Sequence, residues 1–104
     1  MNIDVKLPDA CRTMQDVRTG VDQTDRELMK LLEKRFGYMR AAARIKPDRG
    51  AVRDEARKAA VIAAAGADAE RAGLPRAEIE ALWERLVEAS IAYEFAEWDR
   101  TRGG

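Results

Sequence analysis

Two cations, Arg35 and Lys46, lie in the stretch EKRFGYMRAAARIK at positions where the apolar face of a helix would continue. Lys46 follows Arg35 by 11 residues, which is about 20° in projection and roughly 16 Å along a helix axis. Arg18 precedes Arg35 by 17 residues, or about 25 Å. Arg18 therefore cannot reach a small molecule held by Lys46 of its own chain, but it could reach one held by the partner chain if two such helices run antiparallel.

A hydroxyl and a carboxyl group interrupt a second apolar face. Ser90 and Glu94 are four residues apart on one side of a C-terminal helix, where they would point inward. Asp54, Arg57 and Lys58 share a face at the start of a middle helix, at spacings i, i+3 and i+4. Polar groups at such positions need a partner, because burying an unpaired polar or charged group is costly.

Each of these residues also has a purely structural interpretation. Arg18 could pair with a nearby aspartate, Lys46 could stabilise a helix C-terminus, and Arg57 and Asp54 are common at a helix N-terminus. Arg35 and Glu94 could form a structural ion pair. As a set, however, several cations on an apolar interior indicate an anionic ligand. Two or three arginines favour more than one carboxylate, which the guanidinium fork binds in bidentate fashion.

The composition narrows the chemistry. Lys plus Arg and Asp plus Glu both number 19 in 104 residues, so the bulk positive charge typical of nucleic-acid binding is missing. The chain has no histidine and a single cysteine, Cys11, which excludes histidine-assisted nucleophilic catalysis, histidine-based metal sites and an intrachain disulfide. We see no clustered carboxylates for a metal and expect no cofactor. No apolar run approaches a membrane span and no secretory signal is evident, so we expect a cytoplasmic protein.

The elements that must position these residues are all helical. Thr13 and Asp16 have capping-box spacing, Pro47 ends the first helix, and Gly73 is suited to end the second. We expect an all-α chain with three helices, at about 14–46, 52 or 53 to 72, and 75–100.

The remaining residues, about 1–12 and 101–104, are expected to be disordered or extended at the N-terminus and frayed at the C-terminus. We treat 1–104 as a single helical domain. The first helix would be about 50 Å long, far longer than the radius of gyration of about 13 Å expected for this chain length. Alone it would expose an apolar seam, so we predict a symmetric homodimer in which two long helices pair and the shorter ones wrap around them.

Four stretches, DVRTGVDQTDRELMKLLEKR, AAARIK, VRDEAR and LWERLVEASIAYE, resemble the all-helical (AroQ-type) chorismate mutase family, including its isochorismate-pyruvate lyase branch. The resemblance covers residues 16–98. It implies an intertwined homodimer whose active sites each borrow one arginine from the partner chain. That arginine corresponds to Arg18, in agreement with the distance argument.

The resemblance also implies roles for individual residues in binding a small dianionic substrate. Arg18 of the partner chain, Arg35 and Arg57 would hold its carboxylates. Lys46 would donate a hydrogen bond to the ether oxygen of the bond that breaks.

Four further positions complete the implied site. Asp54 would contact the ring hydroxyl, and Ser90 would lie near the ring or a carboxylate. The family often has glutamine where this chain has Glu94, and a glutamate can donate to the ether oxygen only in its protonated form, which burial favours. Lys58 stands where a glutamate that binds the ring hydroxyl is common.

We expect a chorismate mutase, which converts chorismate to prephenate without nucleophile or cofactor. Catalysis would consist of holding the compact conformer and stabilising charge on the ether oxygen, with Lys46, Glu94 and Arg35 as catalytic residues. The alternative is an isochorismate-pyruvate lyase, which forms salicylate and pyruvate, because the loop from Lys46 to Val52 and the W…TRG ending resemble that branch. A non-catalytic helical dimerisation module is the second alternative. No nucleic-acid or membrane partner is expected.

Overall fold

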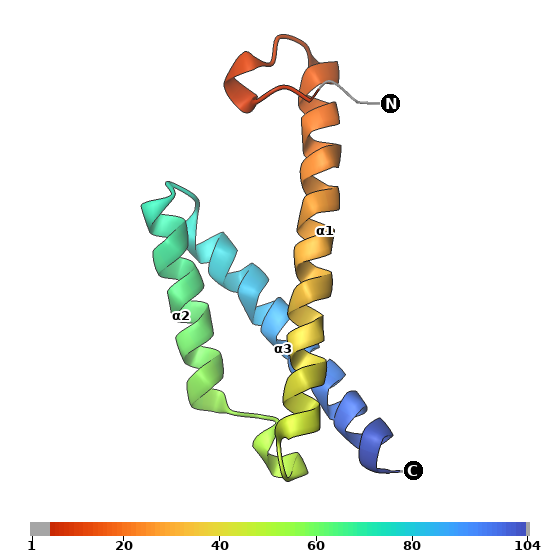
Figure 1. Cartoon of the computed structure of the whole chain (residues 1–104). Helices are drawn as coiled ribbons and strands as arrows, with labels where there is room; N and C mark the ends of the chain where they lie inside the picture. Colours follow the sequence, from red (N-terminus) through yellow and green to blue (C-terminus); the bar gives the residue numbers. More distant parts are fainter. Residues whose placement is uncertain (1–4, 104) are drawn as a thin grey trace. The chain divides into compact units, whose positions relative to one another are not determined.

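The computed structural model describes residues 5–103, and every regular element in that range is helical (Figure 1). The expected all-α class with a long first helix is confirmed. The elements are η1 (Pro8–Ala10), α1 (Met14–Ile45), η2 (Arg49–Ala51), α2 (Glu55–Arg71) and α3 (Arg76–Arg102). Contacts divide the chain into two units, Met1–Arg35 and Phe36–Gly104, with the division inside α1. The single helical domain expected over 1–104 stays a prediction.

The start of α1 is fixed by the side chains that the sequence indicates. The amide of Asp16 donates to Thr13 Oγ1 at 3.1 Å, and the amide of Thr13 donates back to Asp16 Oδ2 at 3.3 Å. The amide of Arg12 donates to the same carboxylate at 2.9 Å, which lowers the pKa of Asp16 below its ordinary value. This reciprocal arrangement satisfies amides that the first helical turn leaves without partners.

In the N-terminal unit, the apolar side chains of α1 remain in contact with solvent. Met14, Val21, Leu28 and Leu31 are each more than half exposed. Residues 1–4 lie outside the described range, and the segment expected to be disordered or extended contains the short helix η1. The apolar side chains of α1 therefore form an exposed surface, which is what the predicted dimer needs for its interface. None of the described helices is both long and apolar enough to cross a membrane.

In the C-terminal unit, α2 and α3 form a helical hairpin, and η2 packs against α3 (Figure 1). The core centres on Val52, Val87 and Ile91. Partly buried apolar side chains surround these three: Val61, Ile62, Trp83, Phe95 and Trp98. The core positions on α3 follow helical spacing, so one face of α3 is apolar along most of its length.

The turn between α2 and α3 depends on one glycine. Gly73 has a φ of 73°, and the amide of Leu74 donates to the carbonyl of Ala69 at 2.8 Å. The amide of Gly73 donates to Glu70 at 3.2 Å, which completes a Schellman motif as expected for a C-terminal glycine. Pro75 is the N-cap of α3.

The expectation of a frayed C-terminus is wrong for residues 101 and 102. Helix α3 continues to Arg102, whose side chain bonds to backbone carbonyls at the end of α1. These contacts hold the final turn in place, which the general tendency of chain ends to fray does not anticipate.

Candidate functional site

The centre of the candidate site is an ion pair between Lys46 and Glu94. Lys46 directly follows α1, and Glu94 lies in α3 with only 4% of its surface exposed. The distance from Lys46 Nζ to Glu94 Oε2 is 2.7 Å, and Lys46 Nζ also donates to the carbonyl of Val52 at 3.4 Å. The structure therefore brings together two of the three residues expected to carry the chemistry.

The Glu94 carboxylate is not fully satisfied by this pair. Oε2 is paired by charge with the ammonium, and among the described residues it accepts no hydrogen bond. The Lys46 side chain is 30% exposed, so one side of the pair faces solvent. The accessible ammonium can donate a hydrogen bond to an oxygen of a ligand, whereas the ionised carboxylate can only accept.

Ser90 lies one turn before Glu94 and is 3% exposed, so the prediction that both point inward is confirmed. Its hydroxyl donates to the carbonyl of Leu86 at 2.7 Å. This local bond fixes the hydroxyl oxygen beside the Glu94 turn. Contact between Ser90 and a substrate stays a prediction.

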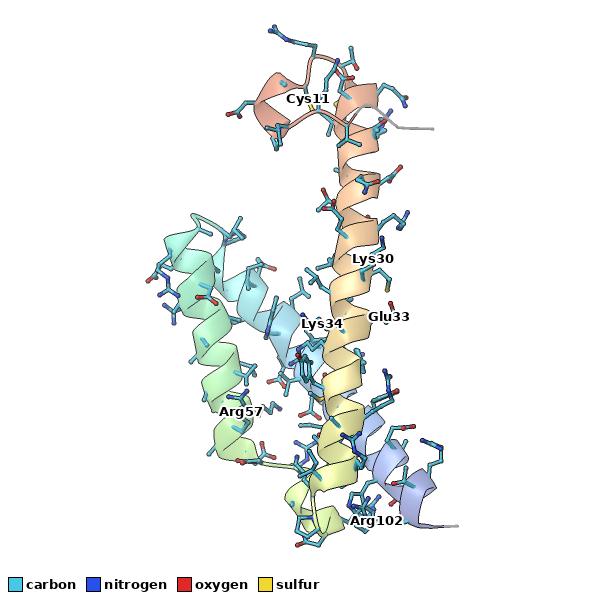
Figure 2. All side chains as sticks on the ribbon, in the orientation of Figure 1. Cys11, Lys30, Glu33, Lys34, Arg57 and Arg102 are labelled. Atoms are coloured by element: carbon cyan, nitrogen blue, oxygen red, sulfur yellow. The ribbon has the colours of Figure 1, made fainter. Side chains whose placement is uncertain are left out.

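Asp54 and Arg57 lie at the start of α2. Asp54 is its N-cap, and Asp54 Oδ1 accepts a hydrogen bond from the amide of Arg57 at 3.0 Å. The Arg57 side chain is drawn at the N-terminal end of α2 (Figure 2), and the residue is exposed. Asp54 therefore has the structural role of a cap, and its contact with a ring hydroxyl stays a prediction.

Lys58 takes part in a separate cluster with two glutamates of α3. Lys58 Nζ lies 2.6 Å from Glu84 Oε2 and 2.6 Å from Glu88 Oε2, and hydrogen bonds to Glu84 and Glu88 raise the pKa of Lys58. Glu88 also binds the guanidinium of Arg53 at 2.9 Å. The Arg53 and Lys58 hydrogen bonds lower the pKa of Glu88 to about 2. Glu84 and Glu88 were missed from the sequence, although their i, i+4 spacing marks one face of α3.

Arg18 and Arg35 belong to the other unit, Met1–Arg35. Arg18 is exposed and Arg35 is half-buried. Their contribution to the site around Lys46 stays a prediction. Among residues 5–103, no group of three acidic, cysteine or histidine side chains is arranged to hold a metal ion.

Comparison with known proteins identifies the family. The model of the family "Chorismate mutase type II" matches residues 17–95, a range that includes every expected site residue. The chain is also 30% identical over 99 residues to an isochorismate pyruvate lyase of Pseudomonas aeruginosa, covering 95% of this chain and 98% of that protein. The chain therefore belongs to the chorismate mutase type II family and is an enzyme of the chorismate mutase and isochorismate pyruvate lyase kind.

Proposed function

We propose that the chain is an isochorismate pyruvate lyase that breaks the ether bond of isochorismate to give salicylate and pyruvate. The observation that supports cleavage of the ether bond is the partly accessible Lys46 ammonium, which buried Glu94 holds in an ion pair; both reactions of the family would use this donor. The sequence favours the mutase reaction. We prefer the lyase because the curated relative that bears this name is similar over 98% of its length.

The proposed chemistry requires only positioning and electrostatics. As the ether carbon–oxygen bond breaks, one hydrogen passes from the ring to the methylene carbon of the enolpyruvyl group, so the atoms balance without a co-reactant. Negative charge develops on the ether oxygen, and the Lys46 ammonium stabilises it by donating a hydrogen bond. Arg18 of the partner chain, Arg35 and Arg57 hold the two carboxylates and restrict the substrate to a reactive conformer.

Chorismate mutase activity is the second candidate, and the description of the matching family favours it. The two reactions break the same ether bond and require the same hydrogen-bond donor. They differ in what the enolpyruvyl group receives from the ring, a hydrogen in the lyase and a new carbon–carbon bond in the mutase. Substrate identity and conformer choice therefore decide between them.

Supplying each substrate separately tests the proposal. With isochorismate, salicylate fluorescence should rise together with an equal amount of pyruvate. With chorismate, the competing product is prephenate. Prephenate formation with a kcat/KM higher than that of the lyase reaction would assign the chain as a mutase. Turnover of neither substrate would favour the non-catalytic helical module.

We further propose that the active unit is a homodimer in which Arg18 enters the partner's site. The exposed apolar face of α1 supports this assembly. Chains carrying Arg18→Ala and chains carrying Lys46→Met should each be inactive. After they are unfolded together and refolded, about half of the dimers should be mixed, each with one intact site, so about a quarter of wild-type activity should return. A mixture that stays inactive would show that Arg18 does not act across the interface.

A further inference from the structure

The C-terminal end of α1 has a hydrogen-bonding deficit that its own sequence creates. In a helix, the carbonyl of Ala43 would accept from the amide four residues later, but that residue is Pro47, which has no N–H. Ala43 is only 1% exposed, so water has little access to the residue. A buried carbonyl without a donor costs free energy.

Arg102 provides the missing donors from the last turn of α3. Its Nη1 donates to the carbonyl of Ala43 at 2.9 Å, and its Nη2 donates to the carbonyls of Arg44 and Lys46 at 3.1 and 2.9 Å. One guanidinium thus serves three carbonyls at the negative end of the helix dipole, where a cation is favoured. Figure 2 labels Arg102 in the last turn of α3.

Trp98 reinforces the same contact. Its indole Nε1 donates to the carbonyl of Lys46 at 3.2 Å, and the Arg102 guanidinium lies 4.5 Å from the centre of the Trp98 ring. The carbonyl of Lys46 therefore receives hydrogen bonds from two side chains, one turn apart on α3. Helix α3 also carries Glu94, which lies one turn before Trp98 and pairs with the Lys46 ammonium.

We propose that Arg102 is a positioning residue that aligns Lys46 for the reaction. The guanidinium fixes the backbone of Lys46 against α3, while Glu94 on the same helix fixes its ammonium. Both the backbone and the side chain of Lys46 are thereby fixed by contacts with the same helix, α3. These contacts hold the ammonium within hydrogen-bonding distance of the position that the ether oxygen would occupy. The catalytic part of this inference rests on the proposed function, since it assumes that Lys46 is the hydrogen-bond donor.

Because misplacement by about 1 Å can reduce a rate by about 100-fold, loss of the guanidinium should lower kcat more than it raises KM. We expect Arg102→Ala to reduce kcat by about 10- to 100-fold with KM changed by less than about threefold. Arg102→Lys keeps the charge but offers a single ammonium in place of a fork, and it should restore only part of kcat. Arg100→Ala is the matched control, because Arg100 lies in the same turn and pairs with Glu97 on its own helix.

Two measurements that need no substrate test the contacts of Arg102 independently of the proposed function. In the wild-type chain, the guanidinium hydrogens of Arg102 should exchange with solvent more slowly than those of Arg100, as followed by nitrogen-15 NMR. Hydrogen exchange of the backbone at residues 43–52 should accelerate in Arg102→Lys. Both are informative even if neither substrate is turned over, and the first remains informative if Arg102→Ala does not fold.

Several outcomes would overturn the proposal. Equal exchange of Arg102 and Arg100 in the wild type would show that the contacts do not persist in solution. Full recovery of kcat in Arg102→Lys would show that charge alone is sufficient. A kcat for Arg102→Ala within about threefold of wild type, or an equal loss in Arg100→Ala, would show that Arg102 does not position Lys46.

Discussion

Replacing Lys46 by methionine should damage both stability and catalysis, and the two effects can be separated. The Glu94 side chain is 5% exposed, so Lys46→Met leaves a buried carboxylate without its counter-charge. Breaking a buried ion pair in this way costs about 3–5 kcal/mol. Because the Lys46 side chain is 30% exposed, water can replace part of the lost interaction, and we expect a loss of about 2–3 kcal/mol. For a chain of this size the melting temperature should fall by roughly 10 °C.

Adding Glu94→Gln to Lys46→Met should restore stability but not activity. The second substitution removes the buried charge, so the free energy of unfolding should return to within about 1 kcal/mol of wild type. The hydrogen-bond donor to the ether oxygen remains absent, and kcat should stay about 100- to 1000-fold below wild type. Arg44→Met, two residues earlier and exposed, is the control and should change stability by less than about 1 kcal/mol.

Both effects can be measured by urea unfolding and by kinetics with each substrate. The chains to compare are the wild type, Lys46→Met, Glu94→Gln and the double variant. If Lys46→Met retains a rate within a few-fold of wild type, the assignment of Lys46 as the donor is wrong. If the double variant is no more stable than Lys46→Met, the unpaired carboxylate is not the cause of the instability. A double variant that regains activity would place the chemistry elsewhere in the chain.

Two other predictions concern charge and assembly. The pKa of Glu88, lowered from 4.5 to about 2, means that its contribution to stability is present above pH 4.5 and lost as the pH falls toward 2. Glu88→Gln should therefore be less stable than wild type at neutral pH and should lose less stability between pH 4.5 and pH 2. Urea unfolding at successive pH values measures this difference. If the free energy of unfolding changes with pH equally in both proteins, the lowered pKa does not belong to Glu88. Leu28→Glu places a charge on the exposed seam of α1 and should convert the dimer to a monomer in sedimentation velocity, whereas an unchanged mass would exclude Leu28 from the interface.

The sequence predicts the helices well because the signals that define them are local. The Thr13–Asp16 capping box and the glycine that ends α2 depend on residues within one or two turns. The inward direction of Ser90 and Glu94 also follows from spacing along one helix. These features need no knowledge of how the helices pack.

The partners within the site could not be predicted in the same way. The structure pairs Glu94 with Lys46, a partnership that the sequence analysis did not anticipate. The tail was expected to fray, but Arg102 binds carbonyls more than 50 residues earlier in the chain. Such contacts depend on the packing of α3 against the end of α1, which periodicity within either helix does not determine.

The seam of α1 connects folding with catalysis. Ala43 is the one buried residue of this 32-residue helix, and apolar residues such as Val21 and Leu28 are more than half exposed. An isolated helical segment has little stability of its own, because most helical stability in proteins comes from packing of an apolar face. Association of two chains would supply that packing, and the same association would bring Arg18 to the site proposed around Lys46. The association of two chains through α1 would then both stabilise the first half of this helix and complete the binding of the dianion. Dilution below the dimer dissociation constant should therefore abolish activity and the helix content of residues 14–35 together.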